Sequence, residues 1–554
     1  MRHFLLLLSL AWYTLATAQF TPLARSASFP EQQGGYVKLL ILPNGNTVHA
    51  AIVVSPMAGM PIFGRQPAGV TLDLTIYDPS FKEIARKKVP VDLHGKMFYE
   101  FTACFSVNND IVAMITGFSM GNPMLKRMVL DGTTGDLTKE DDLVNGPQMT
   151  SKDQKAFMAG NRLMMPWYIA KKDPFSENYA VSLFGYPNGN GTSQITIMHF
   201  NSTHKTLTKT VLKSPDNKFA VQDVLDIAVI DDKQVEVLHL GYNISRKTDR
   251  DNLTYLTTIK AGGEQSAITL QNKTNELTQH GLVRFNPATN QLFVLTLDRG
   301  ATEERFLAAD VVNYNVLLSV LDQSTKKVLS GGDAITVMGI NQTYRDYFQK
   351  RKNFGGVPEN LIVNRDGSYC ILLEGLLQET RVGSGNTGLA AAGGSSVLGD
   401  LAVLYYAKDR TLVSSSLVPK SHAYVYVEPM YMADRDVKPT YCVMGFQYKS
   451  ATYLNGKNKS YVLMNDIEAN GVSAPNGKVT KIMGLSECDA FAFDVSPGAK
   501  PLPDRKLVFG NKEGHSLGFF STSAYDAEKN IFVTLEIDRD KGDKMSRLVW
   551  LKPE

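Results

Sequence analysis

The clearest pattern of apolar and polar positions lies between His280 and Leu329. Three short apolar runs alternate there with polar turn residues, and a weaker fourth run follows. The runs cover residues 282–285, 292–297, 316–321 and 327–329, and the turns carry Asn286-Pro287 and Asp298-Arg299-Gly300. Apolar runs of this length bounded by Asn, Asp, Pro and Gly are typical of β-strands. The stretch therefore predicts one four-stranded antiparallel meander of about 50 residues.

The same rhythm of strands and turns recurs along the chain. The fourth copy, residues 224–259, is nearly superimposable on the stretch 280–329, whereas the third copy is less regular and the eighth ends one strand short. Asn44-Gly45 marks the first hairpin turn. The copies begin near residues 36, 98, 162, 224, 280, 361, 441 and 517.

Tandem copies of a meander must stack, because one copy alone cannot bury its apolar face. Closing the stack into a ring removes exposed strand edges, and the N-terminal segment 20–33 can supply the strand that the last copy lacks. We therefore predict an all-β protein: a single β-propeller of seven or eight four-stranded blades, with eight favoured. The propeller is expected to span residues 19–554.

Two stretches interrupt the strand pattern. Residues 383–399 are rich in Gly, Ser and Ala and predict a flexible loop inside the sixth copy. Residues 341–352 carry Tyr344, Tyr347, Phe348 and Arg351 at helical spacing and predict the one helix of the mature chain. That helix either packs on the ring or docks a partner.

The last third of the chain resembles uncharacterised secreted β-propeller-like repeat proteins of Gram-negative bacteria. The resemblance rests on a strand at 399–404, the turn Lys408-Asp409, a strand ending in Pro-Lys at 417–420 and an aromatic strand ending in Asn-Asp at 460–466. It implies export and a propeller-like ring. It implies no activity, because that group has no established catalytic residues to carry over. The chain departs from the group in the Gly/Ala-rich loop, where the relatives tend to be Tyr-rich.

The N-terminus has the organisation of a secretory signal peptide. Arg2 and His3 precede the apolar run 4–10, and Ala16-Thr17-Ala18 offers the small residues that signal peptidase requires. We expect a signal peptide at residues 1–18, a mature start at Gln19, and a secreted or periplasmic protein. No later run is apolar over the eighteen or so residues of a transmembrane helix.

Composition narrows the classes of partner and cofactor. The formal net charge of +3 gives no field that would attract nucleic acid, and we expect a monomer without cofactors. The four cysteines, at 104, 370, 442 and 488, lie far apart, and three sit inside strand-like runs. We expect buried free thiols, although an even number of cysteines in an exported chain also permits disulfides in three pairings.

Three motifs with possible chemistry lack the context that each requires. Residues 117–121 fit G-x-S-x-G, but a strand follows where a hydrolase needs a helix. Residues 383–388 fit G-x-G-x-x-G, but they lie in a low-complexity loop of a β region. The acidic turn 538–543 fails as a calcium loop, because its twelfth position is Val549. We therefore predict no catalytic residue from a linear motif, and no metal site.

Four histidines form the binding hypothesis. His94, His280, His422 and His515 each stand at or just before an apolar run. If these runs are the innermost strands, the ring brings their starting ends together around one mouth of the central channel. Imidazoles there could bind an anion or transfer protons, although loop histidines that fill polar gaps are the plainer interpretation.

The leading functional hypothesis is an exported, non-catalytic propeller that presents its loops or a channel mouth to a protein or glycan. The alternative is a propeller-type lyase or hydrolase acting on glycans, whose acid and base would come from different blades. Two converging carboxyls, or a histidine and a carboxyl, with perturbed pKa values on the axis would favour the enzyme.

Overall fold

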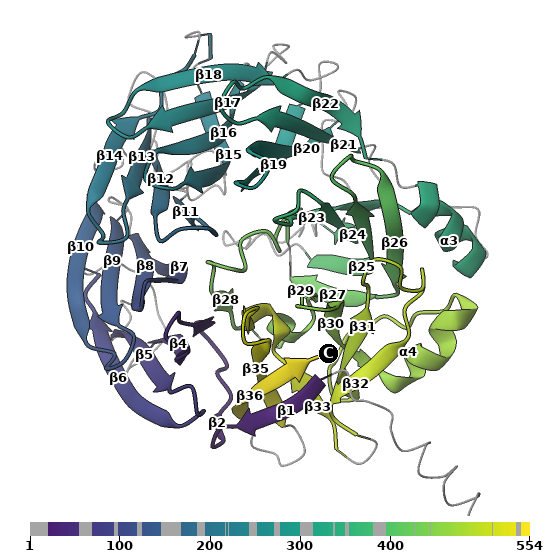
Figure 1. Cartoon of the computed structure of the whole chain (residues 1–554). Helices are drawn as coiled ribbons and strands as arrows, with labels where there is room; N and C mark the ends of the chain where they lie inside the picture. Colours follow the sequence, from purple (N-terminus) through teal and green to yellow (C-terminus); the bar gives the residue numbers. More distant parts are fainter. Residues whose placement is uncertain are drawn as a thin grey trace, which may run out of the picture.

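The computed structural model places eight antiparallel β-sheets in a ring around one axis (Figure 1). It describes residues 20–54, 69–93, 98–118, 124–145, 168–185, 194–215, 218–219, 221–242, 252–270, 277–299, 314–335, 338–348, 354–379, 395–425, 427–443, 445–511, 514–538 and 544–554. The protein is an eight-bladed β-propeller, so the favoured prediction is confirmed. Each sheet is called a blade and is numbered in chain order.

Blades 1 to 4 follow one another along the chain. In each blade the strands run in chain order from the innermost to the outermost. Blade 1 contains β3 (Tyr36–Ile41), β4 (Thr47–Val54), β5 (Val70–Tyr77) and β6 (Glu83–Val91). Blade 2 contains β7 (Phe98–Val107), β8 (Asp110–Phe118), β9 (Met124–Asp131) and β10 (Leu137–Asn145). Blade 3 contains β11 (Tyr168–Lys172), β12 (Tyr179–Gly185), β13 (Gln194–Phe200) and β14 (Thr206–Val211). Blade 4 contains β15 (Val221–Ile230), β16 (Gln234–Tyr242), β17 (Asn252–Lys260) and β18 (Gln265–Leu270).

Blades 5 to 7 keep the same order. Blade 5 contains β19 (Leu277–Asn286), β20 (Gln291–Arg299), β21 (Tyr314–Asp322) and β22 (Val328–Ala334). Blade 6 contains β23 (Gly356–Val363), β24 (Tyr369–Glu379), β25 (Ser395–Tyr406) and β26 (Leu412–Val418), and β27 (His422–Val425) also pairs with β25. Blade 7 contains β29 (Thr452–Asn455), β30 (Ser460–Ile467), β31 (Cys488–Asp494) and β32 (Arg505–Phe509).

Blade 8 is built from both ends of the described chain. Its C-terminal strands are β33 (Ser516–Gly518), β34 (Ala524–Asp526), β35 (Ile531–Asp538) and β36 (Met545–Pro553), and its N-terminal strands are β1 (Phe20–Arg25) and β2 (Phe29–Pro30). Both N-terminal strands pair antiparallel with β36. The predicted closure of the ring by the N-terminal segment is confirmed.

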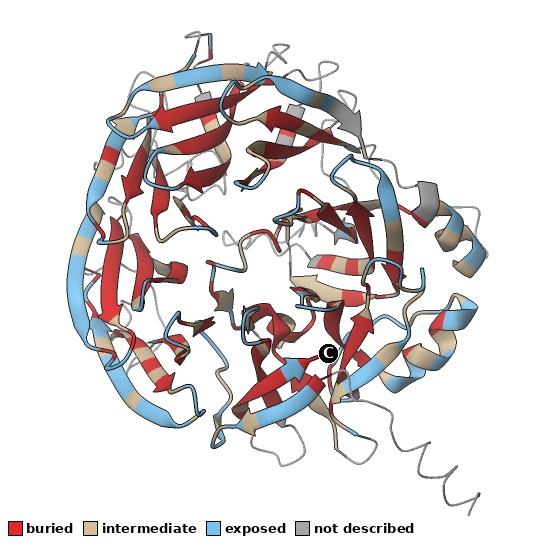
Figure 2. Ribbon diagram, viewed as in Figure 1, coloured by how far each residue is buried: buried red, intermediate tan, exposed pale blue. Residues whose placement is uncertain are grey.

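The core lies between the blades rather than inside any one of them. Eight clusters of buried apolar side chains occur in the described residues, one at each junction between neighbouring blades. Figure 2 shows the pattern: inner and middle strands are buried, and outer strands such as β6, β10 and β18 face solvent. Each blade therefore buries one face against the blade before it and the other against the blade after it. For this reason a middle strand such as β9 is buried at consecutive positions.

The structure corrects several predicted boundaries. The expected helix is α3 (Met338–Phe348), and a second helix, α4 (Glu468–Ser473), was not predicted. The expected loop 383–399 ends earlier, because β25 already begins at Ser395. The expected strand at 441–448 is instead part of the short strand β28 (Thr440–Tyr441), which pairs with β3, and the 3-10 helix η2 (Phe446–Tyr448). Blade 7 consequently starts at β29.

The innermost run of the last copy is also interrupted. The predicted strand 517–523 is divided into β33, the 3-10 helix η4 (Phe520–Thr522) and β34. Another 3-10 helix, η3 (Ala474–Asn476), follows α4. All four cysteines are buried and none forms a disulfide, which confirms the prediction of free thiols.

Candidate binding cavity

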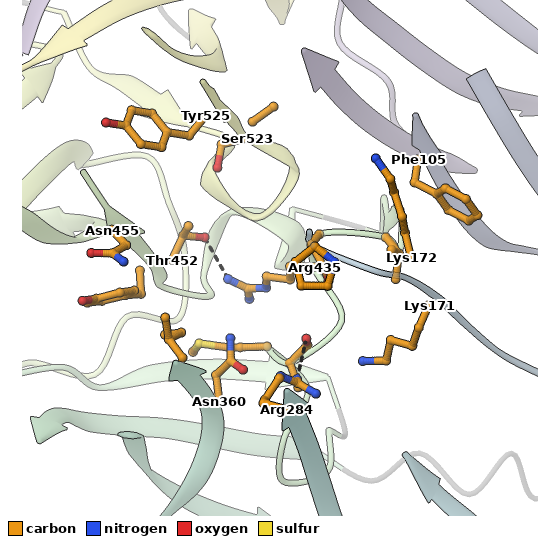
Figure 3. Close-up of a pocket in the computed structure, with 18 of the residues that line it drawn as sticks. Phe105, Lys171, Lys172, Arg284, Asn360, Arg435, Thr452, Asn455, Ser523 and Tyr525 are labelled. Atoms are coloured by element: carbon orange, nitrogen blue, oxygen red, sulfur yellow. Dashed lines mark hydrogen bonds between the residues drawn. The ribbon is translucent and has the colours of Figure 1, made fainter. Parts of the chain in front are cut away.

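A cavity of about 740 Å³ lies on the axis of the ring (Figure 3). Its wall is formed by the C-terminal ends of the inner strands of all eight blades, together with the turn at Asp173, Pro174 and Phe175. The inner strands contribute residues 38–41, 105–106, 171–172, 227–229, 283–285, 360–363, 452–455 and 523–525. Because each strand presents the same end, the cavity belongs to one end of the channel.

One segment of the chain closes the bottom of this cavity. We call residues 427–439, which connect β27 to β28, the plug. The plug leaves blade 6, crosses the channel and reaches blade 1 through the pairing of β28 with β3. Its Met430 N–H donates to the carbonyl of Pro358 at 3.0 Å, and its Val437 carbonyl accepts from the N–H of Cys104 at 2.7 Å. The cavity floor consists of plug residues Met432, Ala433, Arg435, Asp436 and Val437.

Three basic side chains from different blades hold three consecutive residues of the plug. Arg284, in β19, donates to the carbonyl of Ala433 at 3.3 Å. Lys171, in β11, forms an ion pair with Asp434. Lys38, in β3, donates to the carbonyl of Arg435. Blades 5, 3 and 1 thus each contribute one cation to the same short stretch of chain.

Two further blades are tied into this arrangement. Asp226, in β15 of blade 4, accepts from Arg284 at 2.6 Å and pairs with Lys171 at 3.2 Å. The guanidinium of Arg435 turns to blade 7, where it donates to the Ala451 carbonyl and, at 2.8 Å, to the Thr452 hydroxyl (Figure 3). The plug is therefore a hub for most of the ring.

Burial and neighbouring charge set the protonation of the two lysines. Burial alone would lower the pKa of Lys171, but the carboxylates of Asp226 and Asp434 outweigh it and raise that pKa. Lys38 has no such close pair, and burial lowers its pKa to about 8, against a partial opposing effect of Asp436. Lys171 therefore stays charged near neutral pH, and Lys38 loses its proton at a lower pH than an ordinary lysine.

A pair of carboxyls lies beneath the plug and outside the cavity wall. Glu359, in β23, and Glu374, in β24, are both fully buried. Glu359 accepts a hydrogen bond from the N–H of Tyr431, and Glu374 accepts one from the hydroxyl of the same tyrosine at 2.8 Å. Glu374 also pairs with the buried Lys420.

The histidines of the binding hypothesis do not line this cavity. His94 lies outside the described residues. His280 is partly buried near the start of β19, whereas the cavity takes residues 283–285 toward the end of that strand. The mouth expected at the starting ends of the inner strands and the observed cavity are therefore at opposite ends of the channel.

The other two histidines also lie apart from the cavity. His422 is fully buried in β27, which pairs with the third strand of blade 6, so its run is not an innermost strand. Its Nδ1 contacts the Lys449 carbonyl at 2.6 Å, and burial lowers its pKa to about 3. His515 stands just before β33 and contacts Asp489 at 3.2 Å. Whether these histidines bind a ligand stays a prediction.

The rejected motifs fall largely outside the described residues. Of the G-x-S-x-G stretch, the structure describes Gly117 and Phe118 at the end of β8, and the next described element is the strand β9. Residues 383–388 and 539–543 are outside. Across the described ranges, no group of three or more His, Cys, Asp or Glu side chains is placed to hold a metal, and no helix has the length and apolar character of a membrane span.

Sequence reasoning missed the residues that shape the cavity floor, although two signals were present. Lys38 and Arg284 each interrupt an apolar run, and Lys171 ends one. A charge at such a position indicates a buried ionic contact. Residues 427–439 contain no strand pattern between two regular copies. A segment of that kind is a candidate to leave the ring.

The sequence matches no protein-family model and no curated protein. Among solved structures, the polysaccharide lyase Uly1 is 9% identical, with a TM-score of 0.39 over 96% of this chain and 100% of that chain. A polysaccharide lyase described as an ulvanlyase is 9% identical, with a TM-score of 0.40 over 88% and 98% of the two chains. Kuenenia stuttgartiensis hydrazine synthase is 9% identical, with a TM-score of 0.34 over 87% and 98%. At these values the likenesses carry no inference about function.

Proposed function

We propose that this protein is an exported, non-catalytic binding propeller that receives a protein or glycan partner at its axial cavity. The observation that supports the proposal is a cavity of about 740 Å³ to which every blade contributes and whose floor the plug forms. Cavities of this size, largely apolar with a few polar groups, are typical of ligand sites.

The side chains around the cavity favour binding over catalysis. Lys171 and Arg284 are committed to Asp226, and Lys172 pairs with Glu177 at 2.9 Å. Asp173 accepts from the backbone of its own turn and of the next blade. The groups left to meet a partner are mainly aromatic rings and amides, which suit sugar rings or apolar side chains. They include Phe175, Asn360, Tyr453, Asn455 and Tyr525.

The alternative proposal is a glycan-active enzyme, and one observation bears on it. Glu359 and Glu374 are adjacent carboxyls, and burial, followed by the charge of Glu374, raises the pKa of Glu359 well above its ordinary value. Both side chains are fully buried and neither lines the cavity, so a substrate in the cavity does not touch them. For this reason we rank the enzyme second.

Filling the cavity tests the proposal. Ser106 is half-buried in the cavity wall, whereas Ser28 is exposed between β1 and β2 and lies outside it. We expect wild type and Ser28→Trp to capture the same partner from the native envelope fraction or a glycan array, and Ser106→Trp to capture at least tenfold less. Equal capture by all three proteins contradicts the proposal, and shortened or unsaturated glycan products identify the enzyme instead.

Export has its own test. The ring begins at Phe20, directly after the predicted mature start at Gln19. N-terminal sequencing of the protein recovered from its native cells is expected to begin at Gln19. A chain that keeps Met1 contradicts export.

A further inference from the structure

The plug is fastened to blade 6 by one tyrosine and two carboxyls. The Tyr431 N–H donates to Oε2 of Glu359 at 3.2 Å, and its hydroxyl donates to Oε2 of Glu374 at 2.8 Å. Arg435 lies over the face of the same ring, with its guanidinium carbon 5.3 Å from the ring centre. The main chain and the side chain of Tyr431 therefore both depend on this pair of carboxyls.

If both carboxyls are ionised, only Glu374 has an ion-pair partner of its own. Lys420 is fully buried and forms its ion pair with Oε1 of Glu374. Arg435 points its guanidinium at blade 7, where it donates to neutral oxygens. Within the described residues, Oε1 of Glu359 has no hydrogen-bond partner at all. An ionised Glu359 would be buried with one backbone hydrogen bond and no ion-pair partner within 4 Å, which is unfavourable.

A neutral Glu359 removes this cost. Burial, and after it the negative charge of Glu374, raises the pKa of Glu359 well above its ordinary value of 4.5, while Arg435 and Lys420 act in the opposite direction. The phenol of Tyr424, in β27, also lies close, with its ring 6.2 Å from that of Tyr431. No other cation in the described residues forms an ion pair with either carboxyl.

We propose that the plug is a proton-controlled gate: it stays seated while Glu359 holds its proton, and it loosens when that proton passes to solvent and leaves a carboxylate beside Glu374. Loosening the plug opens the floor of the cavity. The gate is a property of the fold and holds whatever the cavity binds.

Amide hydrogen exchange of the full mature protein between pH 5 and pH 9 tests the gate. Protection factors are corrected for the intrinsic rise of exchange with pH. If opening is linked to one proton, protection of plug amides falls about tenfold per pH unit from the ordinary pKa of a glutamic acid up to the raised one, and then levels off. Amides of β16 and β17 in blade 4 serve as an internal reference and are expected to keep their protection.

Two variants assign the effect to Glu359. Glu359→Gln fixes the neutral state, and its plug protection is expected to vary less than twofold over the same pH range. Glu536→Gln is the matched control, because Glu536 is also a buried glutamate but pairs with Arg25 and Arg547 in blade 8. This control is expected to keep the wild-type pH response of the plug.

Three outcomes would overturn the gate. The first is a wild-type protein in which protection of the plug amides does not change with pH. The second is a parallel loss of protection in the plug and in β16 and β17, because that would indicate global unfolding. The third is a Glu359→Gln variant with an undiminished pH response. The first two comparisons need only wild-type protein, so they hold even if a variant does not fold.

Discussion

Phe20 and Pro553 are partners in the register of β1 and β36, so the first and last described strands complete the same blade. The Phe20 ring is buried against Tyr461 at 5.0 Å and Phe532 at 6.1 Å between ring centres. One aromatic side chain from the N-terminus thus joins blade 8 to blade 7.

We expect Phe20→Ala to lower the free energy of unfolding by about 3–5 kcal/mol, because it leaves a cavity where a buried ring had been. Leu23→Ala in the same strand is the control, since Leu23 is 41% exposed and its loss is expected to cost less than about 1 kcal/mol. Urea unfolding at neutral pH measures both. Equal costs for the two variants would mean that β1 does not seal the ring in solution.

Lys171 provides a test of the hub. We expect Lys171→Met to lower the free energy of unfolding by about 3–5 kcal/mol, because it leaves Asp226 and Asp434 without their shared cation. Lys500→Met removes an exposed pair with Asp504 and is expected to change stability by less than about 0.5 kcal/mol. If Lys171→Met is as stable as wild type, the plug is not held by this ion pair.

His422 predicts a loss of stability in acid. Burial, and then the nearby charge of Lys420, holds the pKa of folded His422 near 3, against 6.5 for an ordinary histidine. Between pH 6.5 and pH 3 the unfolded chain therefore binds a proton that the folded chain does not bind. The stability contributed by neutral His422 is complete above pH 6.5 and is lost as the pH falls toward 3. The slope attributable to this residue is about 1.4 kcal/mol per pH unit within that window.

Unfolding curves at several pH values measure the effect of His422. His422→Asn keeps a donor for the Lys449 carbonyl and is expected to have a shallower acid slope than wild type. Lys500→Met, at an exposed lysine, is the control and is expected to keep the wild-type slope. The assignment to His422 is wrong if its variant parallels wild type.

The four cysteines are expected to resist thiol reagents in the folded protein. Burial raises the pKa values of Cys104, Cys370 and Cys442 to about 12, so very little thiolate exists near neutral pH. A colorimetric thiol assay is expected to find almost no reactive thiol in native protein and all four after denaturation without reductant. Fewer than four after denaturation would reveal a disulfide.

Much of the fold could be predicted from local pattern. Each meander repeats the same alternation of apolar runs and turn residues, and Gly45, with a φ of 89°, takes the left-handed conformation expected in the first hairpin turn. The shortage of one strand in the last copy was enough to predict closure by the N-terminus. These features were readable because neighbouring residues determine them.

The remainder depended on contacts between distant residues. Tyr441 lies in a run that resembles a new strand, yet it pairs with Tyr36 of blade 1, which no local pattern encodes. His422 precedes an apolar run in the same manner as His280, but only the pairing with β25 reveals that this run is not innermost. The cavity therefore lies at the other end of the channel from the expected histidine mouth, and sequence reasoning had not singled out the lysines and arginine that hold its floor. Binding by the histidines stays a prediction.

The crossing of the plug also constrains the order in which the molecule assembles. The pairings of Tyr36 with Tyr441 and of Phe20 with Pro553 join residues separated by most of the chain. Contacts of such separation lose much loop-closure entropy, so they form late and slow folding. A nascent chain that has not yet released its last strand cannot form the pairing of β1 with β36 that seals the ring. The blades can condense one after another during synthesis, but the ring locks only when the polypeptide is finished.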